Sequence, residues 1–332
     1  MIYSGTDPAA IAEAARLIRS GELIGLPTET VYGLGADASN DAAVALIFAA
    51  KGRPTNHPLI VHIAEAQQVL DYASSVPPFA ARLIAAFWPG PLTLILSRKP
   101  GVATAAAGGQ DSIGLRCPSH PVAQALLKTY RTGVAGPSAN RFGRVSPTTA
   151  AHVADELGDA LFVLDGGPCD VGIESTIVDC TRGHPVLLRP GVLTRAQLEA
   201  ACGEPVLDTE ALSSNAPRAS GTLASHYAPN AKVRLMDKAE LQKAVAALPN
   251  STTTAAPVAV YAYSIPGPHT VSSASVLYRA MPLQASQVAH ELFAVLRDFD
   301  AQGVAQIWVE ALPATTEWDG VRDRLTRAAV QP

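Results

Sequence analysis

The stretch of sequence that decides the fold comprises residues 27–62. It opens with PTETVYGLG (27–35), which follows a short apolar run, and it closes with KGRPTNHPLIVH (51–62). The second segment gathers a lysine, an arginine, two histidines and two prolines between a predicted helix and a predicted core strand. A connection that serves only to join two elements does not need these side chains. We therefore predict that it forms half of a binding site for a small anionic molecule.

The composition is that of a folded protein with more than one core. Of the 332 residues, 48% are hydrophobic and 16% are charged, and this balance argues against disorder. A chain of this length favours two domains. The formal net charge of −4 disfavours a protein whose main task is to coat nucleic acid, although it is compatible with a local basic pocket.

Helical and strand patterns alternate from the N-terminus to about residue 200. Asp7, followed by proline, predicts the start of a helix that Gly21 ends, and Asn40 predicts the cap of a second helix that stops at Gly52. Strands are predicted at 23–26, 59–63, 92–97, 113–115, 133–136, 161–164, 176–179 and 186–188, and further helices at 65–72, 78–87, 121–130, 148–157 and 194–201. The mixture of short and crossover connections predicts a twisted, mixed α/β sheet with flanking helices over residues 1–204.

The composition changes after residue 204. Residues 205–230 are rich in Ala, Ser, Pro and Asn, which is typical of a linker, but this linker ends in the unusually specific sequence GTLASHYAPN (221–230). From 231 to 332 a second alternation of strands and helices predicts a smaller, Rossmann-like α/β domain. This half contains no G-x-G-x-x-G sequence, so nucleotide binding there has no support.

The cysteines and the apolar segments predict a cytoplasmic protein without a membrane span. Cys117, Cys169, Cys180 and Cys202 lack the spacing of a metal site and are interpreted as reduced structural thiols. The N-terminus does not resemble a secretory signal, and no apolar run reaches the roughly 20 residues that a membrane helix requires.

Polar side chains recur at the ends of the predicted strands. They fall in six segments: Thr28-Glu29-Thr30; Lys51, Arg53, His57 and His62; Ser112 and Arg116; Ser138, Asn140 and Ser146; Glu174-Ser175-Thr176; and Arg189. Ligands of open α/β sheets bind in the crevice beyond the strand ends. We therefore predict one pocket, lined by cations and hydroxyls with few carboxylates, for a phosphate or an amino-acid carboxylate.

Each of these residues also has an ordinary structural explanation. Lys51 and Arg53 suit the C-terminus of a helix, where cations interact well with the helix dipole. Residues 138–140 suit a turn with self-capping side chains, and His62 suits a core position. The conjunction of all six segments, and no single residue, favours a site.

Several chemistries are disfavoured by motif. The chain has no G-x-x-x-x-G-K-[ST] phosphate loop, no H-E-x-x-H or H-x-x-x-H metal motif and no G-x-S-x-G nucleophile elbow. Gly33-Leu34-Gly35 is a weak G-x-G sequence, and we interpret it as a tight turn.

Taken in order, the motifs resemble those of a known family. The segments PTETVYGLG (27–35), AKGRPTNHPLIVH (50–62), WPGPLTLIL (88–96), IGLRCPSHP (113–121), GPSANRFGRVSPTT (136–149), GIESTIVD (172–179) and LLRPG (187–191) are similar to the YrdC-like threonylcarbamoyl-adenylate synthases. GTLASHYAPN (221–230) and WDGVRDRLTRAA (318–329) resemble the long, two-domain form of this family.

The resemblance implies a YrdC-like fold and a specific reaction. L-threonine, bicarbonate and ATP would give threonylcarbamoyl-adenylate and pyrophosphate. The product would pass to the transferase machinery that makes threonylcarbamoyladenosine in tRNA. Mg²⁺ is expected to arrive with ATP and to be held by phosphates and water, without a metal site of the protein.

The resemblance also assigns roles to residues of this sequence. The catalytic positions would be Lys51, Arg53, Ser138 and Asn140. ATP would contact Arg53, His57, Ser112, Ser138, Ser146, Arg189 and Leu223. L-threonine would contact Thr30, His62, Arg116, the backbone of Gly136 and Ser175. His226 and Tyr227 would belong to a lid formed by residues 205–230. His57 departs from the family pattern, which often has asparagine there.

Two other functions compete with this interpretation. An RNA-binding module would use Lys51, Arg53, Arg141 and Arg144 on one rim, and weak tRNA binding would be its mildest form. The acidic net charge and the lack of aromatic residues among these cations weigh against it. A phosphosugar synthase of the same fold would need acidic metal ligands, which the sequence does not assemble.

Overall fold

The structure is a computed structural model that describes residues 1–209, 217–221, 226–248, 257–265 and 276–330. The chain divides into two compact units. The first unit comprises Met1–Phe142 and Ser146–Thr222, and the second comprises Gly143–Val145 and Leu223–Pro332. The boundaries of a separate linker at 205 and 230 stay a prediction.

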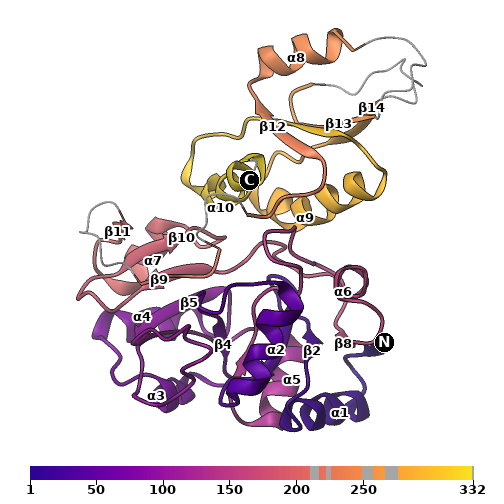
Figure 1. The fold of residues 1–332 in the computed structure, drawn as a ribbon. Coiled ribbons are helices and arrows are strands. Elements are labelled where there is room, and N and C mark those ends of the chain that lie inside the picture. Colours follow the sequence, from indigo (N-terminus) through magenta and orange to yellow (C-terminus); the bar gives the residue numbers. More distant parts are fainter. Residues whose placement is uncertain (210–216, 222–225, 249–256, 266–275, 331–332) are drawn as a thin grey trace. The chain divides into compact units, whose positions relative to one another are not determined.

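The first unit is built on an eleven-stranded mixed sheet (Figure 1). The strands are β1 (Ile2–Ser4), β2 (Ile24–Leu26), β3 (Gly33–Asp37), β4 (Ile60–His62), β5 (Leu92–Ser97), β6 (Ser112–Arg116), β7 (Val134–Ala135), β8 (Phe162–Asp165), β9 (Thr176–Asp179), β10 (Val186–Arg189) and β11 (Leu207–Asp208). Their order in the sheet is β1-β8-β2-β3-β7-β4-β6-β5-β9-β10-β11. Parallel pairs such as β4–β6 alternate with antiparallel pairs such as β5–β6, so the predicted mixed sheet is confirmed.

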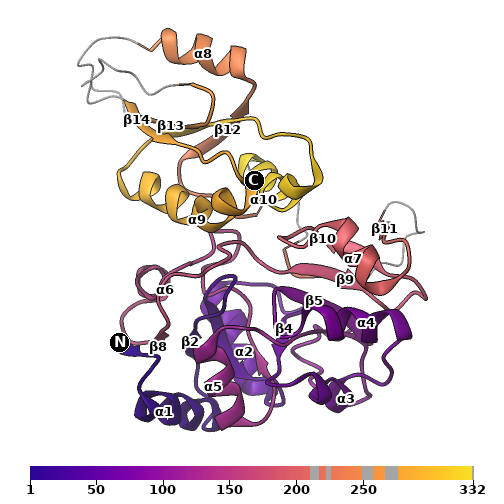
Figure 2. The same cartoon turned by 180° about the vertical axis from the view of Figure 1, so that it is seen from behind.

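Helices cover both faces of this sheet. They are α1 (Pro8–Arg19), α2 (Asp41–Lys51), α3 (Val69–Tyr72), α4 (Pro78–Phe87), α5 (Pro121–Tyr130), α6 (Ala150–Leu157) and α7 (Arg195–Cys202), with a 3₁₀ turn at Ala66–Gln68. Buried residues of α1 and α5 form one apolar cluster, whereas α2, α4 and α7 contribute to another. The helices α1 and α5 lie side by side in both views (Figures 1 and 2). The predicted helix at 65–72 is therefore a 3₁₀ turn followed by α3.

The predicted helix ends are confirmed in atomic detail. The Asp7 side chain accepts a hydrogen bond from the backbone N–H of Ala9, and Asn40 caps α2 in the same way. Gly52 ends α2 with a left-handed φ of 62°, which a residue without a Cβ adopts at little cost. These signals are local, which explains why the sequence shows them.

The interpretation of Gly33-Leu34-Gly35 as a tight turn is wrong. These residues form β3, which lies between β2 and β7 in antiparallel register. Gly35 permits close packing, since a Cβ there would lie 3.1 Å from a methyl carbon of Val134. The short strands β1 and β11 were not predicted either, because two or three residues carry no readable periodicity.

The second unit contains a four-stranded parallel sheet, as predicted. Its strands are β12 (Lys232–Met236), β13 (Val258–Ala262), β14 (Val276–Ala280) and β15 (Gln306–Glu310), in the order β12-β15-β13-β14. Its helices are α8 (Lys238–Ala246), α9 (Ala285–Ala301) and α10 (Asp319–Ala329), with a 3₁₀ turn at Thr316–Trp318. The parallel pairings agree with a Rossmann-like arrangement.

Two further expectations can be compared with the structure. All four cysteines are buried free thiols in the first unit. None of the helices in the described part of the chain is long and apolar enough to cross a membrane.

Candidate active site

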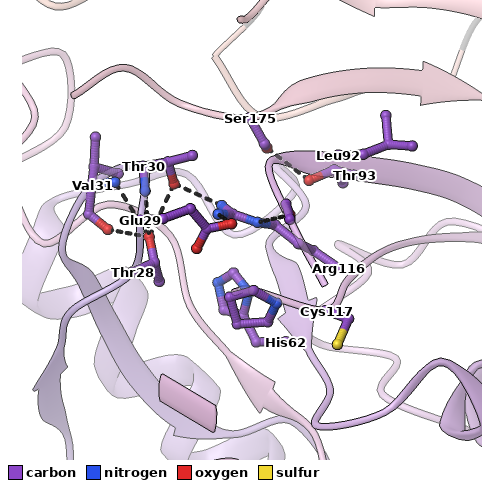
Figure 3. Close-up of polar contacts among 12 residues, drawn as sticks. Thr28, Glu29, Thr30, Val31, His62, Leu92, Thr93, Arg116, Cys117 and Ser175 are labelled. Carbon is purple, nitrogen blue, oxygen red and sulfur yellow. Dashed lines mark hydrogen bonds and ion pairs between the residues drawn. The ribbon is translucent and has the colours of Figure 1, made fainter. Parts of the chain in front are cut away.

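The core of the site is a buried arginine with three protein partners. Arg116 is the last residue of β6, and its register partner in the neighbouring parallel strand β4 is His62. Its Nη1 donates a hydrogen bond to Oγ1 of Thr30 at 2.7 Å, and its Nε donates to the carbonyl oxygen of Gly90 at 3.1 Å. Its Nη2 lies 2.7 Å from Oε1 of Glu29. Figure 3 shows Glu29, Thr30 and His62 gathered around Arg116.

Glu29 and Arg116 form a buried ion pair. Their side chains are 6% and 4% exposed, so solvent screens their charges little. Burial alone would raise the pKa of Glu29, but the charge and the hydrogen bond of Arg116 outweigh it and lower this pKa below its ordinary value. The site therefore holds one fixed positive and one fixed negative charge side by side. Glu29 belongs to the predicted pocket segment 28–30, although the sequence assigned it no role.

His62 is a neutral imidazole with one open nitrogen. Its side chain is buried, and Nε2 lies 3.2 Å from the carbonyl oxygen of Gly136, which can only accept a hydrogen bond. Burial, followed by the charge of Arg116, lowers the pKa of His62 to about 4. Nε2 therefore carries the proton, and Nδ1 offers a lone pair that has no hydrogen-bond partner in the described residues.

Ser175 joins the segment that follows Gly90 to a second arginine. Its hydroxyl lies 2.8 Å from that of Thr93, and Nη2 of Arg189 donates to it at 3.2 Å. The Ser175 carbonyl oxygen accepts two more hydrogen bonds from Arg189, at 3.1 and 2.9 Å. The predicted threonine-binding and ATP-binding sets therefore meet at one residue.

Arg53 and Arg189 converge on Ser220. Nη2 of Arg53 donates to the Ser220 hydroxyl at 3.3 Å, and Nη1 of Arg189 donates to the Ser220 carbonyl at 2.9 Å. Arg53 also donates to the carbonyl of Pro58 at 2.9 Å, and its guanidinium lies over the ring of Phe142. The ring of His57 contacts the same Phe142 ring in an edge-to-face arrangement. Ser112 lines a small cavity together with Pro58 and Ser220.

Lys51 does not point its charge toward these arginines. Its ammonium donates to the backbone carbonyls of Ser138 and Asn140, so it fixes the loop that carries both residues. Burial, followed by the nearby charge of Arg53, lowers the pKa of Lys51 well below its ordinary value. Ser146 hydrogen-bonds Glu174, the residue before Ser175.

The structure therefore brings together most of the residues that the sequence singled out. Three of the predicted site residues do not belong to this group: Leu223 falls outside the described residues, and His226 and Tyr227 belong to the second unit, where Tyr227 stacks with Phe293. Sequence reasoning assigned no ligand contact to Glu29, Thr93, Glu174 or Ser220. Within the described ranges, no group of three or more His, Cys, Asp or Glu side chains could hold a metal ion.

Two family models match this chain almost end to end. One, Sua5/YciO/YrdC, is described as "telomere recombination" and matches residues 16–191, which include the residues of the site described above except Ser220. The other, "threonylcarbamoyl-AMP synthase, C-terminal domain", matches residues 193–330. The chain belongs to the Sua5/YciO/YrdC family.

Relatives of known name agree with this assignment. A threonylcarbamoyl-AMP synthase of Bacillus subtilis is 38% identical over 98% of this chain and 94% of its own length. A threonylcarbamoyl-AMP synthase of Pyrococcus abyssi is 36% identical over 95% of this chain and 93% of its own length. This Sua5/YciO/YrdC protein therefore matches both relatives over nearly their whole length.

Solved structures support the same fold. The crystal structure of P. abyssi Sua5 complexed with L-threonine has a TM-score of 0.86 at 35% identity and covers 97% of this chain and 95% of that chain. Escherichia coli YciO, at 24% identity and a TM-score of 0.50, covers 58% of this chain and 94% of its own, and it supports the fold of the first unit alone. The predicted family and the predicted fold class are thus confirmed.

The buried ion pair should be far more sensitive to substitution than an exposed one. We expect Glu29→Ala to lower the free energy of unfolding by about 3–5 kcal/mol, because it leaves Arg116 buried without a counter-charge. The control Glu13→Ala breaks an exposed pair with Arg16 and should cost less than about 1 kcal/mol. Urea unfolding at pH 7 measures both, and equal losses would contradict the role of burial.

His62 should make stability depend on pH in the acid range. Because its folded pKa is depressed, the unfolded chain binds a proton below about pH 6.5 while the folded protein does not. From pH 7 to pH 5 this difference should cost about 2 kcal/mol, and the loss should saturate near the folded pKa. His62→Gln should remove that part of the slope in urea titrations, whereas the exposed-site control His184→Gln should retain it.

Proposed function

We propose that the protein is an ATP-dependent L-threonylcarbamoyl-adenylate synthase. The observation that carries this proposal is a buried Arg116–Glu29 pair, which suits a zwitterion, beside two arginines that share the acceptor Ser220, which suits phosphates. The two sets are joined through residues 90–93, because Arg116 donates to Gly90 and Thr93 hydrogen-bonds Ser175, which Arg189 contacts. The named relatives and the family of the chain support the same reaction. L-threonine, bicarbonate and ATP are the substrates, and pyrophosphate is released.

The threonine subsite is matched to an amino acid by charge. A free amino acid carries a carboxylate and an ammonium, and Arg116 and Glu29 present the complementary pair. Thr30 and Ser175 offer hydroxyls at the same place, and the lone pair on Nδ1 of His62 can accept a hydrogen bond from the substrate. A guanidinium suits the carboxylate better than an ammonium would, because its two parallel donors fit two oxygens.

The phosphate subsite is built from Arg53 and Arg189. Both arginines donate to Ser220, and phosphate oxygens of ATP would take its place as acceptors. His57, Ser112 and Ser146 complete the proposed ATP contacts. Mg²⁺ would come with the nucleotide and be held by phosphates and water.

The chemistry has two halves. The threonine amine adds to bicarbonate and loses water to give a carbamate. A carbamate oxygen then attacks the α-phosphorus of ATP, the bond to the β-phosphate bridging oxygen breaks, and pyrophosphate leaves. Such a transfer needs mainly positioning and neutralisation of charge, which buried cations supply without having to reorganise. Arg53 would stabilise the phosphates, and Lys51 would act by holding Ser138 and Asn140 in place.

The linker and the fate of the product complete the proposal. Residues 205–230, with Leu223, His226 and Tyr227, would form a lid that keeps water from the mixed anhydride. The product would pass to the machinery that completes threonylcarbamoyladenosine in tRNA, in the cytoplasm. Direct binding of tRNA would be weak at most, because Arg144, a cation of the supposed RNA rim, is paired with Asp300 at 3.2 Å.

The decisive assay mixes pure protein with ATP, threonine and bicarbonate and follows pyrophosphate. Release should depend on threonine, and Arg53→Ala should lower kcat/KM by at least about two orders of magnitude, because one buried donor to a developing charge is worth that much. Arg16→Ala, which removes an arginine that is 60% exposed, should leave the rate unchanged. Threonine-independent release, combined with tight and salt-sensitive RNA binding, would refute the synthase.

Ser175→Ala should separate the two subsites. It removes the hydroxyl next to the threonine subsite but keeps the carbonyl oxygen that holds Arg189 through two hydrogen bonds. We therefore expect KM for threonine to rise about tenfold or more, the loss of one buried hydrogen bond, while KM for ATP changes less. Initial rates at varied threonine and varied ATP measure this, and the reverse pattern would show that the subsites are exchanged.

A further inference from the structure

The first unit carries a groove that the proposed reaction does not use. It has a volume of about 840 Å³ and is lined by α1, α2, α6 and the chain before three strands. Met1, Leu23 and Leu161 stand directly before β1, β2 and β8, which are mutually parallel, so the groove lies at the amino ends of these strands. Glu29 and Thr30 of the active site follow the carboxyl end of β2. In both ribbon views α1 and α6 lie on either side of the N-terminus (Figures 1 and 2).

Exposed apolar side chains gather at this groove. Met1, Tyr3 and Leu46 line it with exposed fractions of 58%, 36% and 48%, and Ile2 beside them is 46% exposed. Only three other large hydrophobic residues of the described chain are as exposed, and they are scattered over α3, the start of α9 and the C-terminus. Contiguous exposed apolar surface of this kind is typical of interaction sites.

The rim of the groove is acidic. Asp7, Glu13, Glu22 and Glu156 line it, against the Arg141 side chain and the ammonium of Met1, and Glu13 is also paired with Arg16. Two copies of the chain that met through this face would bring like charges together, which disfavours a symmetric dimer. Nucleic acid and anionic membranes are disfavoured for the same reason. The charges fit a partner that carries Lys or Arg.

We propose that this groove docks a basic amphipathic helix of a partner protein. Three helices form its walls, so a fourth helix can pack its apolar face against them while its own backbone hydrogen bonds stay satisfied. Its Lys and Arg side chains would meet the acidic rim and set the direction of docking. Leu46 and Ala50 belong to α2, whose last residue is Lys51. The docked helix would therefore contact the helix whose lysine holds the loop with Ser138 in place.

The test uses a designed probe. A fluorescent amphipathic peptide of about 18 Leu and Lys residues is titrated into the full chain and followed by anisotropy, with a Leu/Glu peptide of the same pattern as its counterpart. The Leu/Lys peptide should bind with one site per chain, and binding should weaken when salt is raised from about 50 to about 200 mM. Leu46→Lys should weaken it about tenfold or more, and Glu13→Gln with Glu22→Gln should weaken it while reducing the salt dependence.

The control is Leu70→Lys, which adds the same charge at a leucine that is 56% exposed on α3 and outside the groove. It should leave binding unchanged, and unchanged urea midpoints should show that both variants are folded. The proposal is overturned by no binding, by equal loss in both lysine variants, or by equal binding of the Leu/Glu peptide. A dimer in sedimentation that Leu46→Lys abolishes would assign the groove to a second copy and also overturn it.

Discussion

The structure of the site depends on one buried ion pair. Arg116 ends one strand, and Glu29 lies in the loop after another strand, 87 residues away in sequence. Each charge offsets part of the desolvation cost of burying the other. Such pairs seldom add much net stability compared with apolar packing, because desolvation offsets most of their attraction. Their value is geometric. Arg116 also holds Thr30 and Gly90, so contacts within the protein fix the positions of these groups.

This pair is joined through residues 90–93 to the arginines proposed to bind phosphates, because Arg116 donates to Gly90 and Thr93 hydrogen-bonds Ser175. Ser175 hydrogen-bonds Arg189, and Ser220 accepts from both Arg189 and Arg53. One backbone segment and a few hydrogen bonds therefore connect the two proposed subsites. This suits a reaction in which the amino acid and the nucleotide must be aligned at the same moment.

Helix ends could be predicted from the sequence, whereas contacts between segments that are distant in sequence could not. The caps at Asp7 and Asn40 and the end of α2 at Gly52 are each encoded within a few residues. The candidate residues were recognisable because polar groups accumulate where strands end. The partner of Lys51, the counter-charge of Arg116 and the acceptor shared by two arginines depend on distant segments. The prediction of a turn at Gly33-Leu34-Gly35 was wrong because glycine occurs both in tight turns and in closely packed strands.

The placement of the thiols has a practical consequence. All four cysteines lie in the first unit, each at most 2% exposed, and burial raises the pKa of Cys117, Cys169 and Cys180. An alkylating reagent attacks only an accessible thiolate. The rate of alkylation in native buffer consequently measures how often the first unit opens, and it does not report opening of the second unit. The native cysteines can therefore serve as a built-in probe of local unfolding in the first unit.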